Sequence, residues 1–513
     1  MNFKYCLRFA VLSLVFASFA VPLDAQQTKE TPPPPSEPRS VEIPTVEEVK
    51  LINGLTIVIV SKRDLPLVTV SLLIRGGAGL ENASHAGLAN LTADMLTKGT
   101  DLRNATQIAQ EMEFLGASFS TGADWNGSFA NVSVMRDKLP KAMAIMADSV
   151  IRPTFPADEL NLLKKQRIDN LKVQLKQPGP VWNYVASRYT YGEHSNEGTP
   201  ESIERIRTRD LETFHYANYH PKNAVLIFAG DITKEEGIRY GRLFFGGWKS
   251  PAKGAESKEL IARMDLAPPR PTEAIKNILV IDLPDSGQAA VGVANRVVDG
   301  RVAYVHSDEM ADDEDPKIVS GEYYFPAIVL NSILGGGYSA RLNQEIRIKR
   351  GLSYGARSSF DWRSGYSNFN AFTQTKNESA GEVAELIGAE VEKLSKANIS
   401  ESELVPRKSV VTGSFGRGLQ TNNGLAARVR DLYVFGLQPG HLNSYVSDVE
   451  KVTGLQIRKF AAENLLGGDL IIVGDAKLFL DDLTKRFPNR TIEVIKASNL
   501  DLNSSDLRSS RGR

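Results

Sequence analysis

The chain has 513 residues, of which 42% are hydrophobic and 24% are charged, and its formal net charge at pH 7 is zero. This length is sufficient for two or more domains with substantial cores. The balanced charge gives no global attraction to polyanions, so nucleic-acid binding and electrostatic docking on a membrane are not favoured as functions.

The first 25 residues have the order of a secretory signal peptide. Lys4 and Arg8 precede an apolar run over residues 9–21, and residues 23–25 offer a small-residue cleavage site. We therefore predict a signal peptide at 1–25. A membrane anchor is the alternative, but the run is shorter than the roughly 20 residues that a bilayer span needs.

The predicted mature chain contains no thiol, because the only cysteine, Cys6, lies before the apolar run. Such a chain suits an oxidising compartment, so we expect a periplasmic or otherwise exported, soluble protein. Residues 26–45 include four consecutive prolines and are predicted to form an extended tether.

The sequence contains two related halves. Three short patterns recur in the same order at one offset of 244 residues, which indicates a duplicated domain rather than a short solenoid repeat. The matched patterns are ADEL at 157–160 with ESEL at 401–404, YG at 191–192 with FG at 435–436, and LIFAGD at 226–231 with LIIVGD at 470–475.

The periodicity of the first half predicts both strands and long helices. In chain order these are strands at 55–60 and 67–74, a helix at 87–98, a hairpin pair at 118–123 and 129–135, and helices at 139–150 and 158–175. We expect two homologous α+β domains, each a mostly antiparallel sheet with helices packed on it. The predicted boundaries are an N-terminal domain at 46–250, a linker at 251–275, a C-terminal domain at 276–490 and a disordered tail at 491–513.

Several long motifs resemble the pitrilysin/insulinase-type zinc metallopeptidases, which include the mitochondrial processing peptidase. The motifs are LINGLTIVIV, GLANLTADMLTKGT, GASFSTGADW, NYHPKNAVLIFAGDIT and LGGGYSARLNQEIRIKRGLSYG. They occur in the family's order between residues 46 and 488. The resemblance implies the two-domain fold of the processing peptidases.

The resemblance also implies the position of a zinc site, and the ligands there are replaced. The family motif H-x-x-E-H holds zinc with two histidines on one helix face and uses the glutamate as general base. Its positions fall here on Asn90, Ala93 and Asp94, and the third ligand falls near Asn170. We therefore expect no metal in this chain and zinc in a partner subunit. A hard-cation site at Asn90 and Asp94 is the weaker alternative.

The second half retains a pair of residues that the family uses across the subunit interface. Family members carry an arginine and a tyrosine seven residues apart that reach substrate at the zinc, and these match Arg347 and Tyr354. Arginine can donate a fork of hydrogen bonds, and a tyrosine hydroxyl can donate to a developing oxyanion. Without the resemblance, a salt bridge at a helix end and a buried aromatic would explain the pair.

Two further segments are predicted to contact substrate. One is the strand carrying Ser118, Phe119, Ser120 and Thr121, which matches an edge strand that accepts a peptide by strand addition. The other is the glycine run Gly335, Gly336 and Gly337, for which a helix cap is the alternative. Residues 308–315 form an acidic insertion, and the sequence does not decide whether it binds an ion.

The most consistent interpretation is the non-catalytic, substrate-binding subunit of a heterodimeric zinc peptidase. Its partners would be a homologous zinc-bearing chain and peptide substrates. A non-enzymatic peptide-binding or scaffold protein is the alternative. A self-sufficient peptidase is disfavoured, because the six histidines show no spacing that rebuilds a zinc site.

Overall fold

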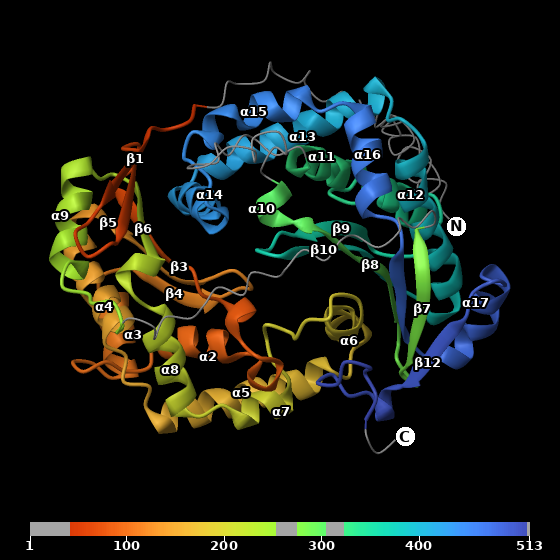
Figure 1. The fold of residues 1–513 in the computed structure, drawn as a ribbon, viewed down its shortest axis with the longest axis horizontal. Coiled ribbons are helices and arrows are strands. Elements are labelled where there is room, and N and C mark those ends of the chain that lie inside the picture. The colour runs from red at the N-terminus through yellow and green to blue at the C-terminus, as the bar shows by residue number, and fades with distance from the viewer. Residues whose placement is uncertain (1–41, 253–273, 304–322, 510–513) are drawn as a thin grey trace, which may run out of the picture. The chain divides into compact units, whose positions relative to one another are not determined.

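Two six-stranded sheets, one from each half of the chain, organise the protein (Figure 1). The computed structural model describes residues 42–252, 274–303 and 323–509. The predicted signal peptide, nearly all of the tether and linker, and the acidic insertion at 308–315 lie outside these residues.

The elements of the first half follow the predicted order closely. In chain order they are β1 (Val46–Lys50), β2 (Thr56–Ser61), β3 (Leu67–Ile74), α2 (Leu88–Met95), α3 (Ala105–Phe114), β4 (Ser118–Ala123), β5 (Ser128–Met135), α4 (Leu139–Ile151), α5 (Ala157–Gln174), α6 (Pro178–Val185), the π-helical η4 (Ala186–Thr190), α7 (Pro200–Arg205), α8 (Thr208–Asn218), β6 (Ala224–Gly230) and α9 (Lys234–Phe245).

The second half largely repeats this order, except that its edge strand β12, which occupies the sheet position of β1, comes last. Its elements are β7 (Ile275–Asp282), β8 (Ala289–Asp299), α10 (Gly300–Ala303), α11 (Tyr324–Leu334), the π-helical η7 (Asn343–Ile348), β9 (Ala356–Asp361), β10 (Tyr366–Thr375), α12 (Ala380–Lys396), α13 (Glu401–Leu419), α14 (Asn422–Phe435), α15 (His441–Lys451), α16 (Gly454–Asn464), β11 (Gly468–Gly474), α17 (Leu480–Arg486) and β12 (Ile492–Lys496).

The strand orders confirm the predicted fold class. They are β1-β2-β6-β3-β5-β4 and β12-β7-β11-β8-β10-β9. Most neighbours are antiparallel, and the parallel pairs are β2 with β6, and β7 with both β11 and β12. The central strands β6 and β11 are the LIFAGD and LIIVGD repeats and read as nearly continuous apolar runs, because both of their faces are covered.

The two halves exchange a helix. In the first half, α6 and η4 pack on the C-terminal sheet, where Trp182 and Val185 join a cluster with Leu279 and Ile471. In the second half, α14 packs on β3 and β6 of the N-terminal sheet. These two helical stretches occupy matching positions of the repeat, so the duplication produced a reciprocal contact.

Glycine ends both exchanged helices. Gly192 after η4 has φ of 65° and Gly436 after α14 has φ of 73°, and this left-handed conformation favours glycine. This requirement explains why the aromatic-glycine pair recurs at the repeat offset.

The prediction of a disordered tail at 491–513 is wrong for the described residues. Residues Ile492–Lys496 form β12, which pairs in parallel with β7 at the sheet edge. Ile495 is 2% exposed and Leu507 is fully buried. The prediction rested on the many serines and arginines of this segment. Its few apolar residues are enough to order it, because they pack against a sheet edge and α6.

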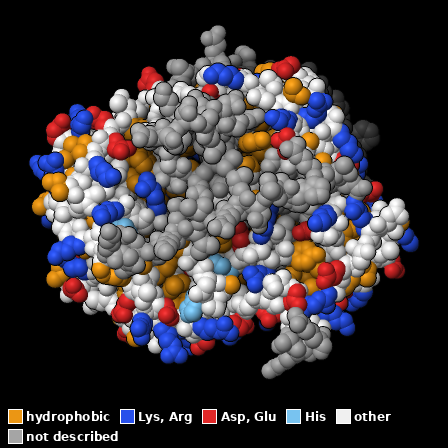
Figure 2. All heavy atoms as spheres, in the orientation of Figure 1, with side chains coloured by type: hydrophobic (Ala, Val, Ile, Leu, Met, Phe, Trp, Pro, Cys, Tyr) orange, Lys and Arg blue, Asp and Glu red, His pale blue; other side chains and the backbone are white. Residues whose placement is uncertain are grey.

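The described surface is mixed in charge. Figure 2 shows lysine and arginine side chains interspersed with aspartate and glutamate over the visible face, as the zero net charge suggests. Within the described ranges, no helix is both long and apolar enough to cross a bilayer.

Candidate functional site

Helix α2 carries the residues aligned with the zinc motif. Asn90 and Asp94 lie one turn apart and share a face of the helix, and Ala93 is fully buried. Both polar atoms of the Asn90 side-chain amide form hydrogen bonds. The nitrogen donates to the backbone carbonyl of Asn196 at 2.8 Å, and the oxygen accepts from the backbone N–H of Ala123 at 3.3 Å. Asn90 therefore joins α2 to a loop and to the end of β4.

Asp94 forms an ion pair with Arg167 of α5, with 2.6 Å between the two side chains. Burial raises the pKa of Asp94, and the charge of Arg167 opposes that increase. Asn170, placed near the third ligand position, is exposed on α5. The α5 residue that faces Asp94 is thus Arg167, and sequence reasoning missed it.

Arg347 and Tyr354 lie on the surface of the C-terminal half. Arg347 belongs to η7, and its guanidinium lies 5.0 Å from the ring centre of Tyr338. Tyr354 is 91% exposed. In the part of the chain that the structure describes, Arg347 forms no ion pair, so the purely structural explanation of a salt bridge with a buried aromatic does not fit.

Tyr354 shares a cavity of about 480 Å³ with the glycine run, of which Gly335 and Gly337 line the wall. Gly335 follows the last residue of α11, so the alternative role as a helix end is also present. A Cβ atom on Gly335 would lie 2.1 Å from the backbone nitrogen of Ser358. Only glycine therefore allows the loop to approach β9 this closely.

Strand β4 is an edge strand of the N-terminal sheet, as predicted. Ser118 and Ser120 line a second cavity of about 220 Å³, which also includes Asn423 and Arg430 of α14. Phe119 packs instead against the core on the opposite face. Of the predicted substrate-binding residues, Ser118, Ser120, Gly335 and Gly337 thus line two separate cavities of this chain.

Two family models match the chain in succession. The model described as "Insulinase (Peptidase family M16)" matches residues 56–187, and "Peptidase M16 inactive domain" matches residues 205–408. The chain belongs to peptidase family M16.

Known relatives agree with this assignment. An uncharacterized zinc protease of Mycobacterium leprae is 24% identical over 423 residues, covering 81% of this chain and 88% of the relative. The uncharacterized zinc protease YmxG of Bacillus subtilis is 24% identical over 385 residues, covering 73% and 85%.

Solved structures show the same fold. A peptidase M16 inactive domain from Pseudomonas fluorescens matches with a TM-score of 0.69 and 25% identity, covering 84% of this chain and 98% of that one. A protease from Helicobacter pylori matches with a TM-score of 0.73 and 19% identity, covering 84% and 100%.

The M16 zinc position does not fit zinc in this chain. Zinc sites need imidazole, thiolate or carboxylate donors in a fixed arrangement. Asn90 supplies an amide that is already hydrogen-bonded, Ala93 supplies no donor, and the carboxylate of Asp94 is paired with a guanidinium. Among the described residues, no group of three histidine, cysteine, aspartate or glutamate side chains is placed to hold a metal.

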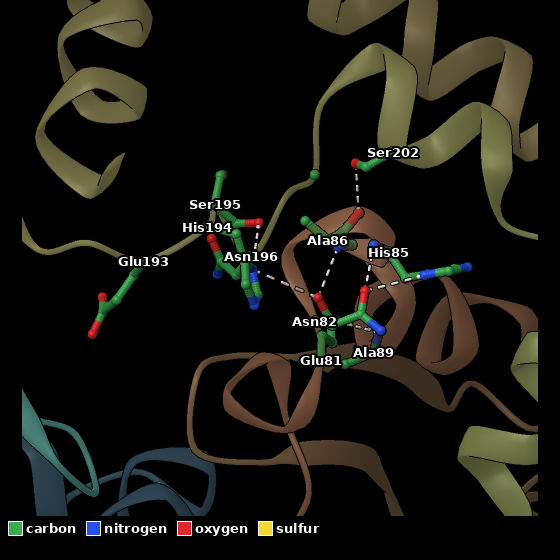
Figure 3. A network of polar contacts seen from close by, with 12 residues as sticks. Glu81, Asn82, His85, Ala86, Ala89, Glu193, His194, Ser195, Asn196 and Ser202 are labelled. Carbon is green, nitrogen blue, oxygen red and sulfur yellow. Dashed lines mark hydrogen bonds and ion pairs between the residues drawn. The ribbon is translucent and has the colours of Figure 1, made fainter. Parts of the chain in front are cut away.

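The carboxylate of a buried glutamate lies at the start of α2. The side chain of Glu81 is 0% exposed and accepts hydrogen bonds from the backbone of Gly87, at 2.9 Å, and of Ala89. Figure 3 shows this turn beside the loop that carries His194 and Asn196. Burial raises the pKa of Glu81 to about 8, although the two backbone donors oppose the increase.

His194 connects this turn to the C-terminal half. Its Nδ1 lies 3.8 Å from Glu81, and its ring lies 5.3 Å from that of Trp125. The guanidinium of Arg363 lies 4.4 Å from the ring centre of Trp125 and pairs with Glu193. Sequence reasoning treated His194 as isolated, because its partners come from distant segments.

We expect the free energy of unfolding to decrease as the pH rises from 6.5 to 8, because of Glu81. Its folded pKa is raised above the unfolded value of 4.5, so its contribution is present at low pH and is lost as pH rises toward 8. Burial lowers the pKa of His194 below 6.5, which produces the opposite slope but only at lower pH.

Urea denaturation at several pH values tests this expectation. Glu81→Gln should reduce the pH dependence of the free energy of unfolding between pH 6.5 and 8. For one proton, that dependence is at most about 1.4 kcal/mol per pH unit. Asp101→Asn, at an exposed position, serves as the control. An unchanged slope in Glu81→Gln would assign the pH dependence to other groups.

Proposed function

We propose that this M16 chain is the non-catalytic, substrate-binding subunit of a two-chain zinc peptidase that degrades or processes peptides. The proposal rests on a difference between the N-terminal and C-terminal halves of the chain. Arg167 supplies the positive charge beside Asp94 where the family holds a metal, whereas Tyr354 extends into solvent beside an open cavity.

Packing within the chain does not account for the position of Tyr354. An exposed aromatic ring removes no apolar surface from water, and its hydroxyl forms no hydrogen bond within the described chain. A hydroxyl held beside a glycine-lined cavity can donate to a peptide carbonyl and to the oxyanion formed from it. The metal that activates water for that step would come from a zinc-bearing homologue.

Strand β4 offers the second substrate contact. Among the described residues no strand neighbours its outer edge, so its backbone groups there are available to an extended peptide. Such recognition uses main-chain hydrogen bonds and tolerates varied sequences, which suits a peptidase with unfolded substrates.

The purified chain alone is expected to hold no stoichiometric zinc and to cleave no peptide. An amide and a guanidinium-paired carboxylate are poor zinc donors, and Ala93 leaves no general base at the family position. Metal analysis together with a peptide-cleavage assay checks this. About one tightly held zinc per chain, with cleavage that a chelator abolishes, would overturn the proposal.

The proposed compartment is the periplasm or another exported location. The short apolar run followed by a polar segment predicts a mature chain that starts near Gln26. Mass spectrometry of the protein recovered from cell fractions measures its first residue. A product that retains Met1 in the membrane fraction would contradict export with cleavage.

A further inference from the structure

A further cavity, of about 290 Å³, is lined by residues of both halves. It shares no described lining residue with the cavity at Tyr354. Its wall is largely aromatic: Trp125 comes from the β4–β5 turn, Trp362 from the end of β9, and Tyr324, Phe415 and Tyr445 from three helices. Phe415 and Tyr445 stack with ring centres 4.0 Å apart.

Three carboxylates border this aromatic cavity, namely Asp124, Asp361 and Asp431. Asp124 accepts two backbone hydrogen bonds at 2.9 Å from Asn126 and Gly127, and it forms no ion pair among the described residues. Burial raises the pKa of both Asp124 and Asp431, and the charge of Asp124 contributes to the increase at Asp431. The carboxylates are therefore close enough to repel one another.

The nearby arginines neutralise this acidity only in part. Arg363 is engaged with Glu193 and with Asp361. Arg430 lies 3.6 Å from Asp431, longer than a hydrogen bond. Arg428 and His441 are the basic residues of the described lining, and the charge of Arg428 opposes the increase in the pKa of Asp431. Asp124 is thus influenced by the charge of Arg430 but forms no ion pair among the described residues, and it lines the cavity together with the aromatic rings.

We propose that this cavity binds an organic cation, an ammonium or guanidinium group carried on an apolar stem. Aromatic faces attract cations, and a desolvated site strengthens both that attraction and the attraction to carboxylates. The same chemistry is presented by a lysine or arginine side chain of a peptide and by a free amine. The cavity is thus a second recognition site, separate from the one at Tyr354.

Benzamidine is a suitable probe, because it joins an amidinium to an apolar ring. Trp125 and Trp362 line the cavity, whereas Trp182 and Trp248 are buried elsewhere, so tryptophan fluorescence reports occupancy. Titrating the full chain with benzamidine should change the fluorescence saturably. Benzamide, which is neutral, and benzoate, which is anionic, should bind at least tenfold more weakly. Equal responses to all three probes, or no response, would overturn the proposal.

Asp431→Asn and Asp124→Asn keep the side-chain shape and remove the charge. Each should weaken benzamidine binding by about tenfold, as expected for the loss of one charged partner. Asp137→Asn, at an exposed position outside the cavity, should bind as the wild type does. Unchanged affinity in both cavity variants, with unchanged thermal midpoints, would contradict the cation site; a variant that does not fold leaves the other to decide.

A competition experiment separates the two sources of the cation. A short unstructured peptide with one arginine is titrated against bound benzamidine, and the same peptide with citrulline is its control. Displacement by the arginine peptide alone assigns the site to basic side chains of peptides. Benzamidine binding that neither peptide disturbs assigns it to free amines. Displacement by both peptides alike would contradict recognition of the charge.

Discussion

Tyr354→Phe in this chain should lower the turnover of a reconstituted two-chain peptidase about a hundredfold while leaving assembly intact. A donor aimed at a developing oxyanion is worth ~3 kcal/mol in the transition state, which corresponds to that factor. The side chain is 91% exposed, so its hydroxyl contributes little to the stability of the isolated chain. The effect should appear mainly in kcat, because the interaction strengthens as charge develops.

The experiment mixes this chain with a zinc-bearing M16 homologue and measures activity that neither chain has alone. Arg347→Ala should also reduce turnover, since its guanidinium would lose contact with the substrate carbonyl or carboxylate. Tyr216→Phe, at a tyrosine that is 55% exposed on α8, is the matched control and should retain full turnover. If the Tyr354 and Arg347 variants assemble and keep full turnover, the scaffold interpretation should replace the proposed one.

Strand positions were predictable because the decisive information is local. The run LVTVSLLI at 67–74 is mostly apolar and half of its residues are β-branched, and β3 has those bounds. The pair at 118–123 and 129–135 alternates with the period of a hairpin, and β4 and β5 pair in antiparallel register. The glycine-ended helices at 191–192 and 435–436 could be matched because a left-handed cap restricts the residue type.

The residues around α2 could not be predicted, because their partners come from distant segments. Asp94 and Arg167 are 73 positions apart, and only the packing of α5 against α2 brings them together. Glu81 and His194 are similarly separated in sequence, and neither lies in a motif. The polar composition of residues 491–513 led to the wrong prediction of a disordered tail. A few apolar residues were enough to form β12, because a sheet edge was available to them.

The exchanged helix α6 gives the largest expected stability effect. Trp182 is 2% exposed, its ring centre lies 4.9 Å from that of Phe372, and its indole nitrogen donates to the carbonyl of Ile471 at 2.9 Å. A Cβ atom on Gly292 would lie 2.7 Å from the indole, so this glycine makes room for the ring. The residue therefore joins a helix of the first half to the sheet of the second.

We expect Trp182→Ala to lower the free energy of unfolding by about 3–5 kcal/mol, because it removes buried apolar contacts and leaves a cavity beneath α6. Trp182→Phe keeps most of the packing and loses the hydrogen bond to Ile471, so it should cost about 1 kcal/mol. Phe114→Ala, at a side chain that is 88% exposed, should change stability by less than about 0.5 kcal/mol. Urea denaturation at equilibrium measures all three variants. If Trp182→Ala proves as mild as Phe114→Ala, α6 detaches from the C-terminal sheet at little cost, and the exchanged helix does not hold the two halves together.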